Sequence, residues 1–505
     1  MKPYALPASL ALIAVIVVAG YFFLRKKPGP ATPPEEASGE FKWTNSIAVL
    51  PFRDYSADKG QETIIQGITD GINSGLRRLD DELKVIATAS VLRYKDTEVN
   101  LTEIARELDV AHILDGSIQA QGNRLQVIAE LINVNDSSIL GSWKRTYDNK
   151  LADVLTIQDD FSQFIAEKLK ISFDVGKFGN AEAIKHANPE AYDYYLKGMN
   201  FITSRYESTY DEKDFQAALS MFQRALDINP DYAQAYAGMA WAYGHKFMVY
   251  GDPATNMARA VEFAEKALKI DPDVALAHAI LGSNFLVYKN APEKAYPHFK
   301  KALDLEPNNS AVNATAGISF LEVGLYEKAR KYLSKALELD PFYIWGHAKL
   351  GNYYRYMGQL EKAEYHYIKY HEISPTNALF PGSYAFLSLL MKKFEKAEKL
   401  IADDEALNPD GSWVKQNKAI LIGLRGDKEK ALAIHQDDYV YSALGMIDEA
   451  IDYILERAQK GRGRPYLLLM HQPVYDTIRD APRFQEILSL QKAKYDELLR
   501  IFPDL

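Results

Sequence analysis

Apolar residues follow three different spacings along this chain, and each spacing predicts a different kind of structure. Residues 4–24 form one uninterrupted apolar run. Between residues 45 and 175, short β-branched runs alternate with stretches in which apolar residues recur every three or four positions. From residue 188 onward only the helical spacing continues, and it repeats. The pattern predicts a multidomain chain: a transmembrane helix, a small α/β domain with a mixed sheet, and an all-α solenoid.

Prolines mark the period of the solenoid. Six of them stand at separations of 42, 35, 34, 34 and 34 residues, and an alanine precedes each by twelve residues. The six are Pro230, Pro272, Pro307, Pro341, Pro375 and Pro409. A repeat unit made of two packed helices needs a small residue where the helices touch, a bulky residue facing it, and a proline that ends the second helix. Gly317 with Leu333 and Gly351 with Tyr367 supply the small and bulky residues.

On this period and these positions, residues 188–460 resemble the tetratricopeptide repeat family. The resemblance implies stacked helix pairs whose first helices line a concave groove for protein or peptide partners. The period decays beyond Pro409, and residues 461–505 are expected to form a C-terminal helical cap. Self-association of the chain is left open.

Groove residues should be those on the first helices that are not used in contacts within a unit. Spacing selects six tentative partner-binding residues: Trp345, Asn352, Arg355, Tyr356, Ser283 and Phe386. Ile318 and Glu322 fall on the same face. This groove would be apolar and aromatic with a few polar groups, which suits a helix or an extended segment. The alternative is that the aromatic residues pack inside the array.

Residues 45–175 carry the signals of the α/β domain. Strands are expected over Ser46–Phe52, Leu83–Ser90, Ala111–Ala120, Arg124–Val134 and Ile139–Tyr147, and helices over Gln61–Leu79, about Leu101–Leu108 and Leu151–Ile171. The order strand, helix, strand, helix predicts that the first two strands are parallel. Turn-forming residues between the last three strands predict hairpins.

Several short motifs of this domain carry a second resemblance. They are the run SIAVLPF from Ser46, Gly67-Ile68-Thr69-Asp70, Ile113 to Ile118, Gly122-Asn123-Arg124, and Trp143 with Tyr147-Asp148. They resemble the TolB-N-terminal-like (FlgO-like) domain of bacterial signalling proteins, which in that family is commonly followed by tetratricopeptide repeats. Larger members often carry an adenylate cyclase or winged-helix domain ahead of it. We expect neither, because too few residues precede the domain in this sequence.

The motif residues also have a structural interpretation. Gly116 and Gly122 are expected at tight backbone positions, and Trp143 in the core. The functional alternative places a small-ligand site at the strand ends and would make the chain an enzyme or an accessory subunit. Its loops carry Arg53, Asp54, Arg93, Lys95 and Asp115.

The apolar run at residues 4–24 is long enough to span a bilayer as a signal anchor. A cleaved signal peptide is the competing interpretation, although Arg25-Lys26-Lys27 suits a retained anchor better. Residues 28–44 are Pro-rich and predict a disordered linker. We expect a single pass through the inner (cytoplasmic) membrane. The family resemblance favours a periplasmic body, and the flanking charges favour a cytoplasmic one.

Composition narrows the chemistry. A net charge of −9 argues against nucleic-acid binding, and the absence of cysteine excludes disulfides and thiolate sites. The ten histidines are dispersed, and the close pair His366 and His371 lacks the spacing of helical metal ligands. No cofactor, metal or catalytic residue is expected. The sequence therefore predicts a non-catalytic scaffold or sensor.

Overall fold

A computed structural model describes most of the chain after residue 44. The described residues are 45–56, 62–77, 83–95, 97, 99–122, 124–148, 154–171, 188–206, 211–249, 253–375, 380–460 and 462–505. The predicted anchor and linker lie outside them. Within the described part, no helix has both the length and the apolar character to cross a membrane. The described residues belong to one compact unit.

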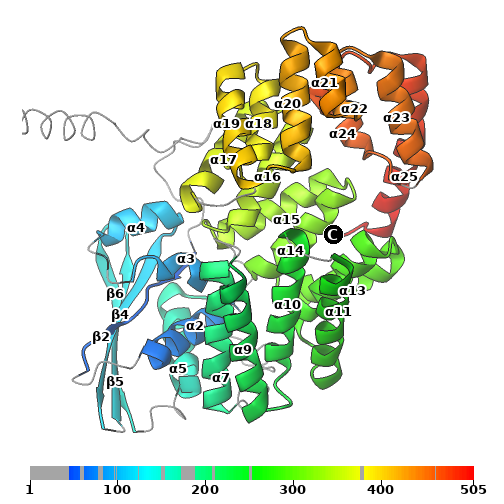
Figure 1. Cartoon of the computed structure of the whole chain (residues 1–505). Helices are drawn as coiled ribbons and strands as arrows, with labels where there is room; N and C mark the ends of the chain where they lie inside the picture. Colours follow the sequence, from blue (N-terminus) through cyan, green and yellow to red (C-terminus); the bar gives the residue numbers. More distant parts are fainter. Residues whose placement is uncertain are drawn as a thin grey trace, which may run out of the picture. The chain divides into compact units, whose positions relative to one another are not determined.

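A mixed sheet forms the centre of the α/β domain (Figure 1). Its strands are β1 (Ser46–Val49), β2 (Arg53–Asp54), β3 (Lys84–Val85), β4 (His112–Gln121), β5 (Arg124–Asn133) and β6 (Ser138–Tyr147). The order is β3-β1-β4-β5-β6, and β2 pairs with β4. The pairs of β1 with β3 and with β4 are parallel, whereas β4, β5 and β6 are antiparallel. The predicted parallel pair and both hairpins are confirmed.

Helices cover the two faces of this sheet. Helices α2 (Glu62–Arg77) and α5 (Val154–Leu169) share one core with the sheet, and α3 (Thr88–Leu92) and α4 (Leu101–Leu108) share the other. The Trp143 ring was expected in the core; it is half-buried and packs against the core, 5.3 Å from the rings of both Phe161 and Phe164 of α5. A side chain at Gly116 would come within 2.9 Å of the Phe52 ring, which explains the glycine.

The predicted strand at Leu83–Ser90 differs from the structure. Pairing ends after Ile86, whose amide donates to the carbonyl of Ile47, and α3 begins at Thr88. The next amide, that of Ala87, donates instead to the carbonyl of Leu339 in the repeat array, 2.8 Å away. A distant contact therefore takes over the backbone hydrogen bonding that a longer strand would need.

The repeat array consists of helix pairs. Its helices are α7 (Pro189–Asn200), α9 (Glu212–Ile228), α10 (Ala233–Val249), α11 (Pro253–Ile270), α12 (Ala275–Ser283), α13 (Pro292–Leu305), α14 (Ser310–Glu322), α15 (Tyr326–Leu339), α16 (Ile344–Tyr356), α17 (Leu360–Ile373), α18 (Phe380–Leu390), α19 (Phe394–Leu407), α20 (Ser412–Leu424), α21 (Lys428–Ile434), α22 (Asp438–Ala443) and α23 (Ile447–Gln459). The π-helical turns η2 (Phe201–Tyr206) and η3 (Asn284–Tyr288) extend α7 and α12. Each of α9, α11, α13, α15, α17 and α19 ends two residues before its proline. The predicted period and its helix-ending role are confirmed.

Small residues bring the two helices of each unit together, as predicted. A Cβ atom at Gly317 would lie 2.8 Å from the Leu333 side chain, and one at Gly351 would lie 2.6 Å from the Tyr367 ring. These distances are shorter than van der Waals contact. Only glycine allows this packing.

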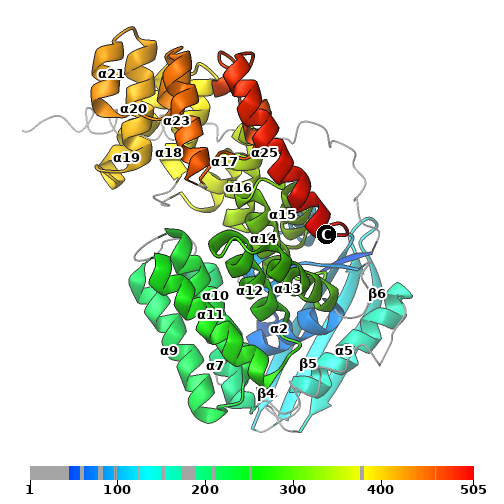
Figure 2. The same cartoon turned by 90° about the vertical axis from the view of Figure 1, so that its right-hand side faces the viewer.

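The C-terminal segment does more than cover the last unit. It contains α24 (Tyr466–His471), η4 (Pro473–Tyr475) and α25 (Pro482–Ile501), and Figure 2 shows α25 running back along the array. Near the C-terminus, the buried ring of Phe502 packs 5.3 Å from that of Phe320 in α14. The segment therefore contacts units that lie far before it in the sequence.

Candidate functional site

A hollow of about 330 Å³ lies on the first helices of consecutive repeat units. Residues of α10, α12, η3, α14 and α16 contribute to its lining, together with Met257 of α11. Its apolar wall is formed mainly by Trp241, Met257, Ile280, Val287 and Ile318. The inner face of this part of the array is therefore apolar and partly open: Val287 and Ile318 are half-buried, whereas Ile280 is 4% exposed.

One ion pair provides the charge in the hollow. The Lys349 ammonium lies 2.8 Å from the Glu322 carboxylate, and the Lys349 side chain is 14% exposed against 47% for Glu322. The charge of Lys349 lowers the pKa of Glu322. Across the hollow, burial lowers the pKa of His245 to about 4, so this ring is neutral at physiological pH. The more accessible charge is the carboxylate.

Hydroxyl groups add hydrogen-bond acceptors. Thr315 Oγ1 donates to the carbonyl of Ala311 at 2.8 Å, and Ser319 Oγ donates to that of Thr315 at 2.7 Å. Because both protons are used within α14, the oxygens offer lone pairs. This wall can accept hydrogen bonds from a ligand that brings N–H groups.

The six predicted groove residues separate into three groups. Ser283 lines the hollow, with Ile318 and Glu322 from the same prediction. Asn352 and Tyr356 are half-buried and lie outside its lining. Trp345, Arg355 and Phe386 are only 6%, 1% and 0% exposed. The prediction that these three residues lie on an open groove is therefore wrong.

Aromatic packing explains why these residues are closed off. The Arg355 guanidinium carbon lies 4.7 Å from the ring centre of Tyr356, 5.1 Å from that of Phe386 and 5.8 Å from that of Trp413. The Phe386 ring stacks at 5.0 Å on Tyr439 of α22. Helices beyond Pro409 thus cover the inner face here. Among the described atoms, Arg355 Nη1 has no hydrogen-bond partner.

Spacing could have found part of the hollow that the sequence analysis missed. Ser283, Ile318 and Asn352 each stand eleven residues after the proline that precedes their unit. Trp241 stands eleven residues after Pro230. Its unit has the longer separation of 42 residues and so matches the repeat pattern less well.

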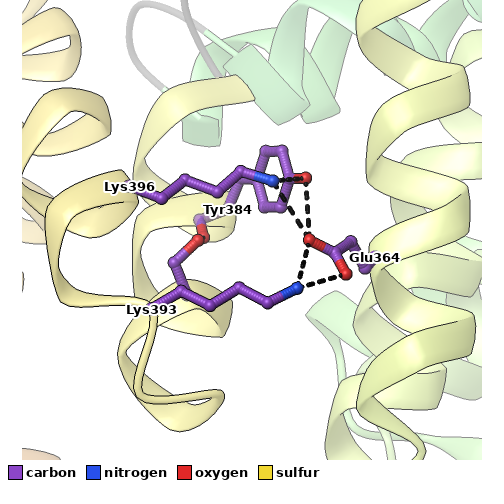
Figure 3. A network of polar contacts seen from close by, with 5 residues as sticks. Glu364, Tyr384, Lys393 and Lys396 are labelled. Carbon is purple, nitrogen blue, oxygen red and sulfur yellow. Dashed lines mark hydrogen bonds and ion pairs between the residues drawn. The ribbon is translucent and has the colours of Figure 1, made fainter. Parts of the chain in front are cut away.

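A polar network joins two successive units (Figure 3). Glu364 of α17 accepts hydrogen bonds from Lys393 at 2.7 Å and Lys396 at 3.0 Å, and Tyr384 of α18 donates to it at 3.2 Å. Burial opposes ionisation, but the bonds from the two lysines lower the pKa of Glu364. The network lies outside the hollow and links α17, α18 and α19. Its role is to hold neighbouring units together.

The strand-end loops of the α/β domain are occupied by other contacts. Arg53 forms an ion pair with Asp115. The Arg93 guanidinium lies 3.6 Å from the ring centre of Phe342, and Ser90 Oγ donates to Asp340 in the repeat array. The segment that carries Ser90 and Arg93 therefore packs against the array, whereas Arg53 and Asp115 pair within the α/β domain.

Comparisons with known proteins agree with this geometry. Residues 286–346 match the family model described as tetratricopeptide repeat. "Putative adenylate cyclase 3" of Rhizobium meliloti (strain 1021) is 29% identical over 238 residues, covering 47% of this chain and 39% of that protein. "Tetratricopeptide repeat protein 6" of Homo sapiens is 35% identical over 112 residues, covering 22% of this chain and 20% of that protein. The chain thus matches well under half of the length of either relative.

Among solved structures, PilW, titled a widely conserved type IV pilus biogenesis factor, is 21% identical with a TM-score of 0.34, over 45% of this chain and 98% of that one. The family match and the helix-pair geometry together support one conclusion. The array is built from tetratricopeptide repeats, a fold that typically mediates protein–protein interaction.

Proposed function

We propose that this chain is a membrane-anchored, non-catalytic scaffold or sensor that binds a protein or peptide partner in the hollow of its repeat array. The observation that carries the proposal is the composition of the hollow. An apolar wall, acceptor oxygens and a half-exposed carboxylate occur together on the first helices of consecutive units.

These groups define the kind of segment that fits. The wall around Ile280 and Ile318 takes a bulky apolar side chain, which contributes by leaving water. The hydroxyl oxygens of Thr315 and Ser319 accept N–H groups. Glu322 favours a basic residue beside the apolar anchor. A helix or an extended segment with an apolar and a basic residue meets all three demands.

A pair of substitutions tests the proposal. Ile318→Asp places a charge on the apolar wall, whereas Leu490→Asp changes an exposed leucine on α25 that is not part of the hollow. Partners captured by cross-linking the full chain in its native membrane should be lost with Ile318→Asp and retained with Leu490→Asp. Equal capture by both variants would contradict the assignment of the hollow.

Membrane attachment and signalling form the second part of the proposal. The apolar run at residues 4–24 would anchor the chain in the inner membrane by a single pass. The resemblance of residues 45–175 to the TolB-N-terminal-like domain favours a periplasmic body. A topology reporter fused to the C-terminus should be active in the periplasm; activity in the cytoplasm would reverse the placement.

An enzyme or accessory subunit acting at the strand ends is the alternative. It has less support, because Ser90 and Arg93 at that edge contact the repeat array. The name of the relative from Rhizobium meliloti does not change this, because the match covers 39% of that protein.

A further inference from the structure

Two pairs of histidines, far apart in the sequence, meet inside the array. Nδ1 of His278 on α12 lies 3.0 Å from Nδ1 of His298 on α13. Nδ1 of His347 on α16 lies 3.0 Å from Nδ1 of His366 on α17. Neither pair is close along the chain, since its two histidines are 20 or 19 residues apart, so spacing within one helix does not reveal it. Their repeat register coincides, since the first histidine of each pair stands six residues after a unit-ending proline.

The backbone fixes the tautomer of the first histidine in each pair. His278 Nε2 lies 2.9 Å from the carbonyl oxygen of Pro272, and His347 Nε2 lies 3.1 Å from that of Pro341. A carbonyl only accepts, so Nε2 carries the proton and Nδ1 of the neutral ring presents a lone pair. In the unit between them, Asn313 Nδ2 donates to the Pro307 carbonyl at 2.8 Å. All three side chains thus contact the carbonyl of the proline six residues before them. Histidine differs from asparagine in having a second ring nitrogen, Nδ1, that is not used in this contact.

We propose that His278 and His298 form a binding site for a divalent transition-metal ion with a preference for nitrogen ligands, Cu²⁺ above all. Metal-to-imidazole bonds of about 2.0–2.1 Å place two neighbouring ligands roughly 2.8–3.0 Å apart in tetragonal geometry and about 3.4 Å apart in a tetrahedron. The observed 3.0 Å, the length of the hydrogen bond that joins the two rings without metal, also lies in the tetragonal range. The bond from His278 to Pro272 is the outer contact that commonly orients a ligating imidazole.

Binding replaces one hydrogen bond with two metal bonds. In the metal-free pair, His298 Nδ1 must donate its proton to His278 Nδ1, because His278 carries its own proton on Nε2. When the ion binds, the proton of His298 moves through solvent to its Nε2, and both Nδ1 lone pairs become ligands. No net proton is released, and water completes the coordination. In the described part of the chain no third histidine or carboxylate joins such a group, so affinity rests on the two rings.

The surroundings distinguish the two pairs. The Phe285 ring stacks on His298 at 5.5 Å. Two lysines stand on the same helix as His298: Lys294, whose ammonium lies over the Phe285 ring, and Lys301, which pairs with Asp273 at 2.7 Å. The proposed site is thus covered on one side by the Phe285 ring.

The second pair is more enclosed. Tyr354 stacks on His366 at 5.4 Å and Tyr365 meets it edge-on at 5.2 Å, while His347 is buried. At the position of Tyr365 the first pair has Pro297, which is exposed. A hydrated ion can therefore reach the first pair, and the second pair serves as a matched control.

The intervening unit supplies the test substitutions, since Asn313 and Tyr332 occupy the same repeat positions as His278 and His298. Cu²⁺ is added to the chelator-treated full chain carrying His278→Asn, His298→Tyr or the control pair His347→Asn with His366→Tyr. Calorimetry and electron paramagnetic resonance should show one bound ion with two imidazole nitrogens in the wild type and in the control. Either single substitution should weaken binding at least tenfold.

Two results would overturn the proposal. One is unchanged binding in both His278→Asn and His298→Tyr, and the other is loss of the two-nitrogen signal in the control. His298→Tyr leaves the contact between His278 and Pro272 intact. If His278→Asn does not fold, the folded His298→Tyr variant still tests the site. A rise in unfolding temperature with Cu²⁺, present in the wild type and the control and absent in His298→Tyr, is the independent measurement.

Discussion

Two regions of the array share one repeat but differ in what their first helices face. Around Ile280 and Ile318 these helices border a hollow of about 330 Å³. Around Arg355 and Phe386 the side chains are 1% and 0% exposed, and the Phe386 ring stacks on that of Tyr439. The repeat determines the helix pair and its internal contacts. What lies on the inner face is decided by distant parts of the chain, here the helices beyond Pro409.

The largest expected difference between the regions is in stability. Phe386→Ala should lower the free energy of unfolding by about 3–5 kcal/mol, because it leaves a cavity in a closed core. Ile318→Ala should cost less than about 2 kcal/mol, since its side chain is already half-exposed in the hollow. Denaturant unfolding followed by circular dichroism measures both. Equal costs would mean that the two inner faces are equally packed.

The buried histidine pair should make the closed region sensitive to acid. Burial lowers the pKa of His347 from 6.5 to about 4 in the folded protein. Between these values the unfolded chain binds more protons, so the free energy of unfolding falls as pH falls, by about 3 kcal/mol in total.

His347→Asn keeps a donor for the Pro341 carbonyl and removes the titrating ring. Its unfolding free energy should therefore fall less than that of the wild type between pH 6.5 and 4. His278→Asn is the control, because it makes the same replacement in the half-buried pair of His278 and His298. Parallel pH curves for the wild type and His347→Asn would show that the buried ring does not titrate in this way.

Local signals in the sequence were sufficient to predict the repeat units. Pro307, Pro341 and Pro375 each stop a helix two residues earlier, and Gly351 faces Tyr367 as expected. Proline geometry and close helix approach depend on neighbours within one unit, so a single sequence reveals them.

Contacts between distant segments were not predictable in this way. The strand after Leu83 is short because Ala87 bonds to Leu339, and Arg355 is buried because α22 folds back. Local spacing does not tell which distant segments come into contact. The hollow is an intermediate case, since spacing selected Ser283 and Ile318 but not Met257 of the second helix.

Asp340 tests a third inner surface, where the array meets the α/β domain. Burial raises the pKa of Asp340 to about 6, although the bond from Ser90 opposes the shift. Here the folded state binds more protons than the unfolded chain above pH 4. Stability is therefore lost as pH rises through 6, by about 3 kcal/mol in total. This is opposite in sign to the effect of His347.

Asp340→Asn should remove that loss and be more stable than the wild type at pH 7. Thermal unfolding at pH 4.5 and pH 7 measures the difference, which should be smaller at the lower pH. A variant that is less stable than the wild type at pH 7 would show that the charged carboxylate is needed at this junction.

Two substitutions with the smallest expected effects on stability should differ in their effect on partner capture. Arg355→Met removes a buried charge whose described contacts include no carboxylate, and methionine packs well among the surrounding rings. The free energy of unfolding should change by about 1 kcal/mol or less, and partner capture should be unchanged. Lys349→Met should cost a similar amount but increase capture, because it leaves the Glu322 carboxylate in the hollow without its paired cation and so strengthens its attraction for the basic residue of the partner. If Arg355→Met abolished capture instead, the partner would have to reach the closed region, and the helices beyond Pro409 would have to move aside to admit it.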